Sequence, residues 1–379
     1  MQNSHLFILL FISASSMLSS YVHASIDSIV YKSNSHYHYR IPAIIADTSK
    51  KNTHLYAFSE KRHRGTNLKC GDSGEIDIVM KSSKDNGISW SPEMTVAGEL
   101  PISKEINQFQ AYTNPTVLYA KNGIHLIFNT HLSLKCASGK KVSSSQRMKI
   151  NDRKFWHSFS SDGGKTWSTP KQILIPIALR DRVDMVGPGN GITTEDGRLI
   201  FPASGKNLIS NDYGKTWSVS KMQHGGSEAT IVELCNGNLL RNDRPGFTHT
   251  KFLSGKEEAN NRVYSVGNNK GVGWSNWKAI KGITMPINPW VQASLVKLGC
   301  TNDSQTVLAF STPNHAKSRE KMSIFISKDS GINWQKQSQL TEGKSDYSSL
   351  VKLSNDKLGI LYEDGFGAKS IKYSSIHLN

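Results

Sequence analysis

SSDGGKTW, at residues 160–167, is one of four closely related octets in the chain. The others are SKDNGISW from Ser83, SNDYGKTW from Ser210 and SKDSGINW from Ser327, and GNNKGVGW at 267–274 is a degenerate fifth copy. In the shared pattern, Asp accepts backbone hydrogen bonds that fix a turn and Gly permits a positive φ angle. Trp supplies a large apolar face that can anchor the turn on its own sheet. The octet therefore predicts a repeated structural turn without a catalytic role.

The spacing of the turns predicts a propeller. They start at residues 83, 160, 210, 267 and 327, and strand-like runs flank them, such as IDIVMKSS, KFWHSFSS and KMSIFISK. Long amphipathic helical stretches are scarce, and a period of about 50 to 60 residues with several strands is typical of propeller blades. Six blades of about 59 residues fill 25–379. We expect a single all-β domain, a six-bladed β-propeller, with an insertion at 133–154.

The first 24 residues resemble a signal peptide. The apolar run at 6–12 is too short to span a bilayer, and Val22-His23-Ala24 suits cleavage after Ala24. An uncleaved membrane anchor is the alternative. No later segment is apolar for long enough to cross a membrane, so we expect a secreted or periplasmic protein without stable membrane insertion.

Charge and cysteine content narrow the classes of partner. The net charge is +16, but the basic residues are scattered and no nucleic-acid motif is present, so we expect no nucleic-acid partner. An acidic small substrate or an acidic glycan-coated surface fits this charge. Cys70, Cys136, Cys235 and Cys300 form no metal-binding pattern, and their disulfide pairing stays open. Each repeated turn offers one carboxylate where Ca²⁺ takes six to eight oxygens, so we assign no metal.

The turns and a second motif together resemble a known family. Tyr39-Arg40-Ile41-Pro42 is similar to the Arg-Ile-Pro motif of bacterial sialidases (neuraminidases), and the octets are similar to their Asp boxes. The resemblance extends from about Tyr39 to Glu363. It implies an exo-α-sialidase, a glycoside hydrolase that removes terminal sialic acid from glycoproteins, glycolipids or oligosaccharides with retention. It implies no cofactor, and we expect a monomer because one closed propeller needs no partner.

The resemblance assigns the substrate carboxylate to three arginines. They are Arg40, Arg244 at the end of EATIVELCNGNLLRNDR, and Arg319 in STPNHAKSRE. A guanidinium stays charged and binds a carboxylate as a planar fork. Glu363 in LYEDG matches the glutamate that orients Arg40, and Arg62 in SEKR matches a further arginine at the sugar.

The resemblance also assigns the catalytic groups. Tyr347 in DYSSL matches the nucleophile, and a neutral phenol avoids the repulsion that a carboxylate would meet from an acidic substrate. A free phenol has a pKa of about 10, so the nucleophile needs a base to accept its proton. Glu228 in GGSEATIVEL matches the family glutamate that has this role. Asp72 in CGDSGEIDIV matches the acid/base. Asp77 ranks second because it lies within a strand-like run.

Spacing places these groups on one face. The separation in sequence between Tyr347 and Glu363 equals that between Glu228 and Arg244. Each separation suits one long hairpin whose second strand returns to the same end. Asn114 in YTNPTV is predicted to contact the sugar, with a turn role before Pro115 as the alternative. Further candidates to line the pocket are Trp156, Trp290 and Gln292, although a core role is favoured for the tryptophans.

Three other functions compete with sialic acid hydrolysis. A trans-sialidase, including the intramolecular type, would use the same residues. A catalytically inert sialic-acid-binding propeller would lack Tyr347, Glu228 or Asp72, and all three are present. An Asp-box propeller of unrelated function would lack the set of three arginines.

Overall fold

The computed structural model describes most of the chain from residue 26 onward. The described residues are 26–50, 52–63, 72, 74–98, 108–134, 153–180, 184–222, 225–244, 262–276, 278–279, 290–365 and 367–378. The predicted signal peptide, Cys70, Cys136 and residues 135–152 of the predicted insertion lie outside them. The described residues form 25 strands and one short 3-10 helix, η2 (Ile177–Leu179).

The strands pair into five sheets, four of which have four strands each. The first joins both ends of the described chain: β1 (Ile26–Lys32), β25 (Ser370–His377), β24 (Lys357–Asp364) and β23 (Ser348–Lys352). The second contains β11 (Ile192–Thr193), β12 (Leu199–Ala203), β13 (Lys206–Ser210) and β14 (Ser218–Lys221). The third contains β15 (Ala229–Glu233), β16 (Leu239–Asp243), β17 (Val263–Gly267) and β18 (Lys278–Ala279). The fourth contains β19 (Ser294–Cys300), β20 (Thr306–Pro313), β21 (Met322–Ser327) and β22 (Gln335–Gln339).

The fifth sheet has nine strands in total: seven follow one path, and β5 and β10 branch from it. Its first antiparallel part is β2 (Tyr37–Asp47), β3 (His54–His63), β4 (Ile76–Ser83) and β5 (Met94–Ala97). Its second is β6 (Gln108–Ala120), β7 (Gly123–Leu134), β8 (Lys154–Ser160) and β9 (Lys171–Ile173). One parallel pair, Ile76 with Ala111, connects the two parts, and β10 (Gly189–Asn190) pairs with β6.

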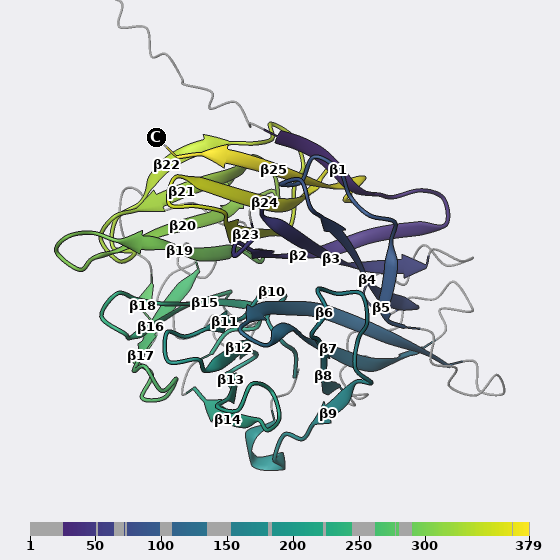
Figure 1. Cartoon of the computed structure of the whole chain (residues 1–379), viewed down its shortest axis with the longest axis horizontal. Coiled ribbons are helices and arrows are strands. Elements are labelled where there is room, and N and C mark those ends of the chain that lie inside the picture. The colour runs from purple at the N-terminus through teal and green to yellow at the C-terminus, as the bar shows by residue number, and fades with distance from the viewer. Residues whose placement is uncertain are drawn as a thin grey trace, which may run out of the picture.

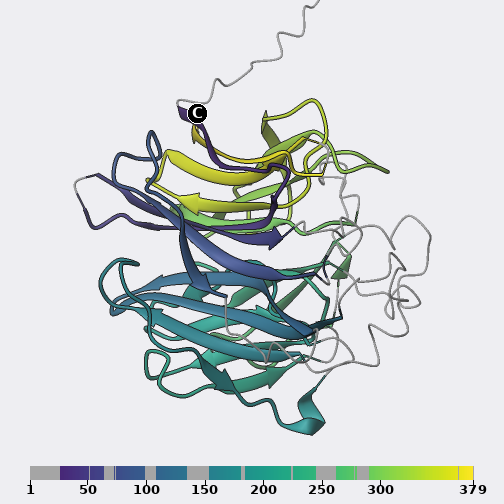
Figure 2. The same ribbon diagram turned by 90° about the vertical axis from the view of Figure 1, so that its right-hand side faces the viewer.

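The sheets surround a common centre, as in a β-propeller. Figure 1 shows β2, β10, β15, β19 and β23 near the middle of the molecule, with later strands of each sheet farther out. The first strand β1 pairs with the last strand β25, which closes the ring, and the two lie together at the top of Figures 1 and 2. The expected all-β propeller is therefore confirmed.

The repeated octets form the expected turns. In the copy at 160–167, Ser160 Oγ donates to Asp162 and accepts the backbone N–H of Gly164 at 2.8 Å. Asp162 Oδ1 also accepts the backbone N–H of Thr166 at 3.0 Å, and Gly164 has a φ of 80°. The same bonds recur in the copies that contain Asp85, Asp212 and Asp329. Each aspartate thus satisfies the backbone of its own turn.

The tryptophans of these turns do not all anchor their own sheet. Trp334 packs on Phe310 of its own sheet, as expected, but Trp90 packs edge-on against Tyr373 of the sheet that contains β25. The expectation was wrong for Trp90, because neighbouring sheets pack closely enough for this turn to reach across. The apolar core likewise lies between sheets: one cluster joins residues of β1, β25 and β24 to residues of β2, β3 and β4.

A disulfide also connects neighbouring sheets. Cys235, just after β15, is bonded to Cys300 at the end of β19, across a sequence separation of 65 residues. A crosslink that closes a loop of this length lowers the entropy of the unfolded chain and stabilises the fold by about 4 kcal/mol.

We expect the variant Cys235→Ser/Cys300→Ser to lose about this much unfolding free energy in chemical denaturation. An unchanged midpoint in the double variant would contradict the expectation.

Two buried histidines predict acid sensitivity. His125 in β7 and His157 in β8 lie with Nδ1 and Nε2 2.9 Å apart, and burial lowers the pKa of His125 to about 3 and that of His157 to about 4. An unfolded chain takes up these protons near pH 6.5, so the pair's contribution to stability is complete above that pH and is lost as the pH falls toward 4.

We therefore expect the urea midpoint to be lower at pH 5 than at pH 7.5, and we expect this decrease to be larger for the wild type than for His157→Gln. The exposed His377 gives the matched control, because His377→Gln should retain the wild-type pH dependence. Equal midpoint changes in the wild type and His157→Gln would refute this role of the pair.

Candidate active site

Two hairpins bring the predicted site residues together. Glu228 directly precedes β15 and Arg244 directly follows β16, and the backbone N–H of Arg244 donates to the carbonyl of Glu228 at 2.8 Å. Tyr347 precedes β23 in the same way, and the backbone N–H of Glu363 donates to its carbonyl at 2.9 Å. The predicted return of each hairpin to the same end is confirmed.

Tyr347 and Glu228 form a buried pair. The phenol hydroxyl of Tyr347 donates to Glu228 Oε1, and the two residues are only 8% and 6% exposed. Arg244 Nη1 donates to the other carboxylate oxygen of Glu228 at 2.7 Å. Burial, reinforced by the negative charge of Glu228, raises the pKa of Tyr347 well above its usual range. The resting phenol is therefore neutral and already bonded to a group that can accept its proton.

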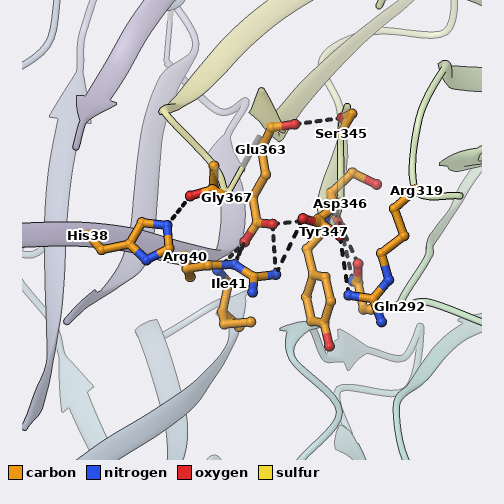
Figure 3. Close-up of polar contacts among 12 residues, drawn as sticks. His38, Arg40, Ile41, Gln292, Arg319, Ser345, Asp346, Tyr347, Glu363 and Gly367 are labelled. Carbon is orange, nitrogen blue, oxygen red and sulfur yellow. Dashed lines mark hydrogen bonds and ion pairs between the residues drawn. The ribbon is translucent and has the colours of Figure 1, made fainter. Parts of the chain in front are cut away.

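Glu363 holds Arg40 in place. Its two carboxylate oxygens accept bonds from Nε and Nη2 of Arg40, both at 2.9 Å, and Oε1 also accepts the backbone N–H of Ile41 at 2.8 Å (Figure 3). Ile41 has a φ of 59°, which is strained for a β-branched residue. The carboxylate of Glu363, itself fully buried, therefore fixes both the guanidinium and the unusual backbone that presents it.

The other arginines lie around the same tyrosine. Figure 3 shows Arg40 and Arg319 on opposite sides of the Tyr347 ring, with their guanidinium carbons 5.3 Å and 6.0 Å from its centroid. Asp346 lies between them, 3.9 Å from Arg40 and 3.2 Å from Arg319. Arg244 is connected to the tyrosine through Glu228, which bonds both of them. The three predicted arginines thus gather around one tyrosine, an arrangement suited to a carboxylate ligand.

Asp72 lies against Arg62, whereas Asp77 does not. Arg62 Nη1 donates to Asp72 Oδ1 at 2.7 Å, and the Asp72 side chain is 74% exposed. Asp77 is buried and bonds His63 Nε2 at 2.6 Å. The charge of Arg62 lowers the pKa of Asp72, so its carboxyl is ionised at rest. Of the two aspartates, Asp72 is the exposed one, and it lies beside a predicted arginine of the site.

The remaining candidates have mainly structural contacts. Asn114 is 8% exposed, its side chain donates to the carbonyl of Val186 at 3.2 Å, and its φ is 60°. Trp156 packs against a core cluster, as favoured above. Gln292 is buried, and it bonds both the carbonyl and the N–H of Ser348. It therefore positions the strand after Tyr347 rather than lining a pocket.

Trp290 joins two of the arginines. Its carbonyl accepts a bond from Arg319 Nη2 at 3.4 Å, and its ring lies 5.3 Å from the guanidinium carbon of Arg244. The residue has a φ of 56°, which is uncommon outside glycine. The suggestion that Trp290 belongs to the site, rather than to the core, is the one that its contacts support.

Sequence reasoning missed Glu60. Its Oε2 accepts bonds from Nε and Nη2 of Arg62 at 2.9 Å and 2.5 Å, and its Oε1 accepts the backbone N–H of Asn114 at 2.8 Å. This repeats the way Glu363 holds Arg40 and Ile41. The alternation of β3 could have revealed it, because residues 60 and 62 of a strand share a face.

The comparisons with known proteins agree with this geometry. The model of the BNR repeat-like domain matches residues 70–361. An exo-alpha-sialidase of Aspergillus fumigatus is 29% identical over 355 residues, 86% of this chain and 79% of its own. One of Arthroderma benhamiae is 26% identical over 359 residues, 88% and 80% of the two chains.

Solved structures share the fold. The Hadza microbial sialidase Hz136 superposes with a TM-score of 0.69 at 24% identity, covering 90% of this chain and 66% of that one. The intramolecular trans-sialidase from Ruminococcus gnavus superposes with a TM-score of 0.68 at 17% identity, covering 93% and 97%.

These relatives show that the protein is a glycoside hydrolase. The chain belongs to the BNR repeat-like domain family and is a sialidase-type member of it. Among the described residues, no helix is long and apolar enough to span a membrane.

Proposed function

We propose that the protein is an exo-α-sialidase that hydrolyses terminal sialic acid from glycoproteins, glycolipids or oligosaccharides with retention of configuration. The observation that carries this proposal is the bond from the Tyr347 hydroxyl to Glu228, between Arg40, Arg244 and Arg319. Sialidases are exceptions to the paired-carboxylate rule of glycosidases and use a tyrosine nucleophile.

In the first step, the three arginines hold the substrate carboxylate and Tyr347 attacks the anomeric carbon. The phenol proton moves to Glu228 and the glycosidic bond breaks. Asp72, which is ionised at rest, first takes up a proton from solvent and then gives it to the leaving oxygen. In the second step, Asp72 takes a proton from water, which attacks the anomeric carbon. The bond to Tyr347 then breaks, and the phenolate recovers its proton from Glu228. Two displacements at one carbon give retention.

The acid role of Asp72 predicts a pH profile. Because Arg62 lowers the pKa of Asp72, the protonated form becomes scarcer as pH rises, by about tenfold per unit above that pKa. We expect kcat/KM to decline toward alkaline pH, and Arg62→Gln to move that decline to higher pH. The measurement is kcat/KM between pH 3 and pH 8 for both proteins, a range that includes the ordinary carboxyl pKa of about 4. A decline at the same pH in both would exclude Arg62 as its cause.

The test of the proposed function is release of a fluorogenic aglycone from an α-sialoside. We expect turnover of the sialoside and none of the matched β-galactoside, which lacks the carboxylate. Proton NMR of the first product then separates the alternatives: free α-sialic acid supports hydrolysis with retention, whereas an anhydro sugar or transfer to an added galactoside indicates a trans-sialidase. Binding of the sialoside without turnover would instead favour an inert sialic-acid-binding protein.

The proposal includes six blades, with β2–β5 and β6–β9 as separate blades, because a single parallel pair connects these two parts of the nine-stranded sheet. It also includes export to the periplasm or the medium, based on the apolar run at 6–12 and the cleavage pattern before residue 25. We further propose a monomer.

A further inference from the structure

Arg262 is a buried arginine that contacts the backbone of Glu228. It directly precedes β17 and is only 3% exposed. Its guanidinium donates to the carbonyls of Glu228 at 3.2 Å and Val291 at 2.9 Å. It also donates to Asn242, to the carbonyl at 3.0 Å and to the side-chain oxygen. One planar group therefore joins three separate segments of chain.

Each of these segments carries part of the site. Glu228 is the proposed base itself, and its carbonyl is the atom bonded by Arg262. Asn242 lies two residues before Arg244, which bonds the carboxylate of Glu228. Val291 follows Trp290, whose carbonyl bonds Arg319. The Arg40–Glu363 pair, in contrast, has no bond to Arg262 in the described part of the chain.

The charge of Arg262 has no carboxylate partner among the hydrogen bonds and ion pairs of the described residues. Burial lowers its pKa to about 10, so the guanidinium is still charged at neutral pH. Its hydrogen bonds go to carbonyl and amide oxygens, and the nearby charges of Asp243 and Glu228 offset only part of its desolvation cost, so this buried cation is a poor choice for stability alone. A second buried arginine of the same sheet, Arg241, differs because it pairs with Asp243 at 2.8 Å.

We infer that Arg262 is a positioning residue for the base: it fixes the backbone of Glu228 relative to Tyr347 and Arg244. This inference rests on the proposed function. Proton transfer from Tyr347 depends on that alignment during the chemical step, and a displacement of about 1 Å can cost a hundredfold in rate. Capture of the substrate carboxylate by Arg40 does not depend on it. Loss of the planar fork should therefore lower kcat much more than it raises KM.

The experiment compares Arg262→Lys with Arg241→Lys, on the α-sialoside and in thermal denaturation. Lysine keeps the charge but carries its donors on a single nitrogen, so it loses the planar fork whose three nitrogens reach the three segments. Arg241 bonds Asp243 and the carbonyls of Lys206 and Ala203, so its variant reports the cost of altering a buried arginine away from the base.

We expect kcat of Arg262→Lys to fall about thirtyfold with KM changed less than about threefold, and Arg241→Lys to keep kcat within about threefold at a similar loss of melting temperature. An inhibitor constant for a 2,3-unsaturated sialic acid that stays near the wild-type value in Arg262→Lys would further support positioning. Equal losses of kcat in the two variants, or a rise in KM that matches the fall in kcat, would overturn the inference alone. A wild type without turnover would overturn the proposed function, and this inference with it.

Discussion

Replacement of Tyr347 by Phe is expected to lower kcat by about a thousandfold while the protein stays folded. Phenylalanine keeps the ring between Arg40 and Arg319 but removes the oxygen that would bond the anomeric carbon. KM should change little, because the arginines proposed to bind the carboxylate remain. The measurement is steady-state hydrolysis of the α-sialoside, with the melting temperature of the variant as a check on folding.

Tyr213 provides the matched control. It is 40% exposed and lies in the repeated turn at 210–217, so Tyr213→Phe should leave kcat within about twofold of the wild type. If Tyr347→Phe keeps wild-type turnover, the enzyme class stands but Tyr347 is not the nucleophile. If both variants lose activity equally, the loss does not arise from the site.

Replacement of Glu363 by Gln is expected to weaken both the fold and the binding of substrate. The carboxylate is fully buried and accepts bonds from Arg40, from the N–H of Ile41 and from the N–H of Tyr347. Glutamine keeps the shape but removes the charge that pairs with Arg40, and breaking a buried ion pair costs about 3 to 5 kcal/mol. We expect a loss of about 3 kcal/mol in unfolding free energy and a KM raised at least about tenfold.

The matched control is Glu195→Gln. Glu195 forms an exposed ion pair with Lys297, with a side chain that is 81% exposed. Exposed pairs contribute little, so this variant should stay within about 0.5 kcal/mol of the wild type and keep its KM. A Glu363→Gln protein with unchanged KM would show that the orientation of Arg40 does not limit substrate binding.

The parts of the fold that depend on local chemistry were predictable. The four octets fix their own backbone through a serine, an aspartate and a glycine, so their conformation follows from sequence alone. The hairpins that return Glu363 to Tyr347 and Arg244 to Glu228 were predictable from spacing, because strand lengths determine which residues meet at one end.

Contacts between sheets were harder to predict. Glu60 accepts hydrogen bonds from Arg62 of its own strand and from the backbone of Asn114 in another strand. Only the packing of the strands brings Asn114 within reach. Arg262 resembled any other basic residue in the sequence, because the oxygens it bonds come from three separate segments. The pairing of Cys235 with Cys300 depends on the same closeness of sheets. Long-range geometry of this kind leaves no local pattern.

The most direct test of the account is to trap the glycosyl-enzyme intermediate. A sialosyl fluoride with an added fluorine at C3 destabilises the positively charged transition states, while its good leaving group lets the first step proceed. After incubation with the wild type, peptide mass spectrometry should find one sugar attached to the phenol oxygen of Tyr347, and none in Tyr347→Phe. A sugar attached to another residue, or turnover with inversion and no adduct, would contradict the account.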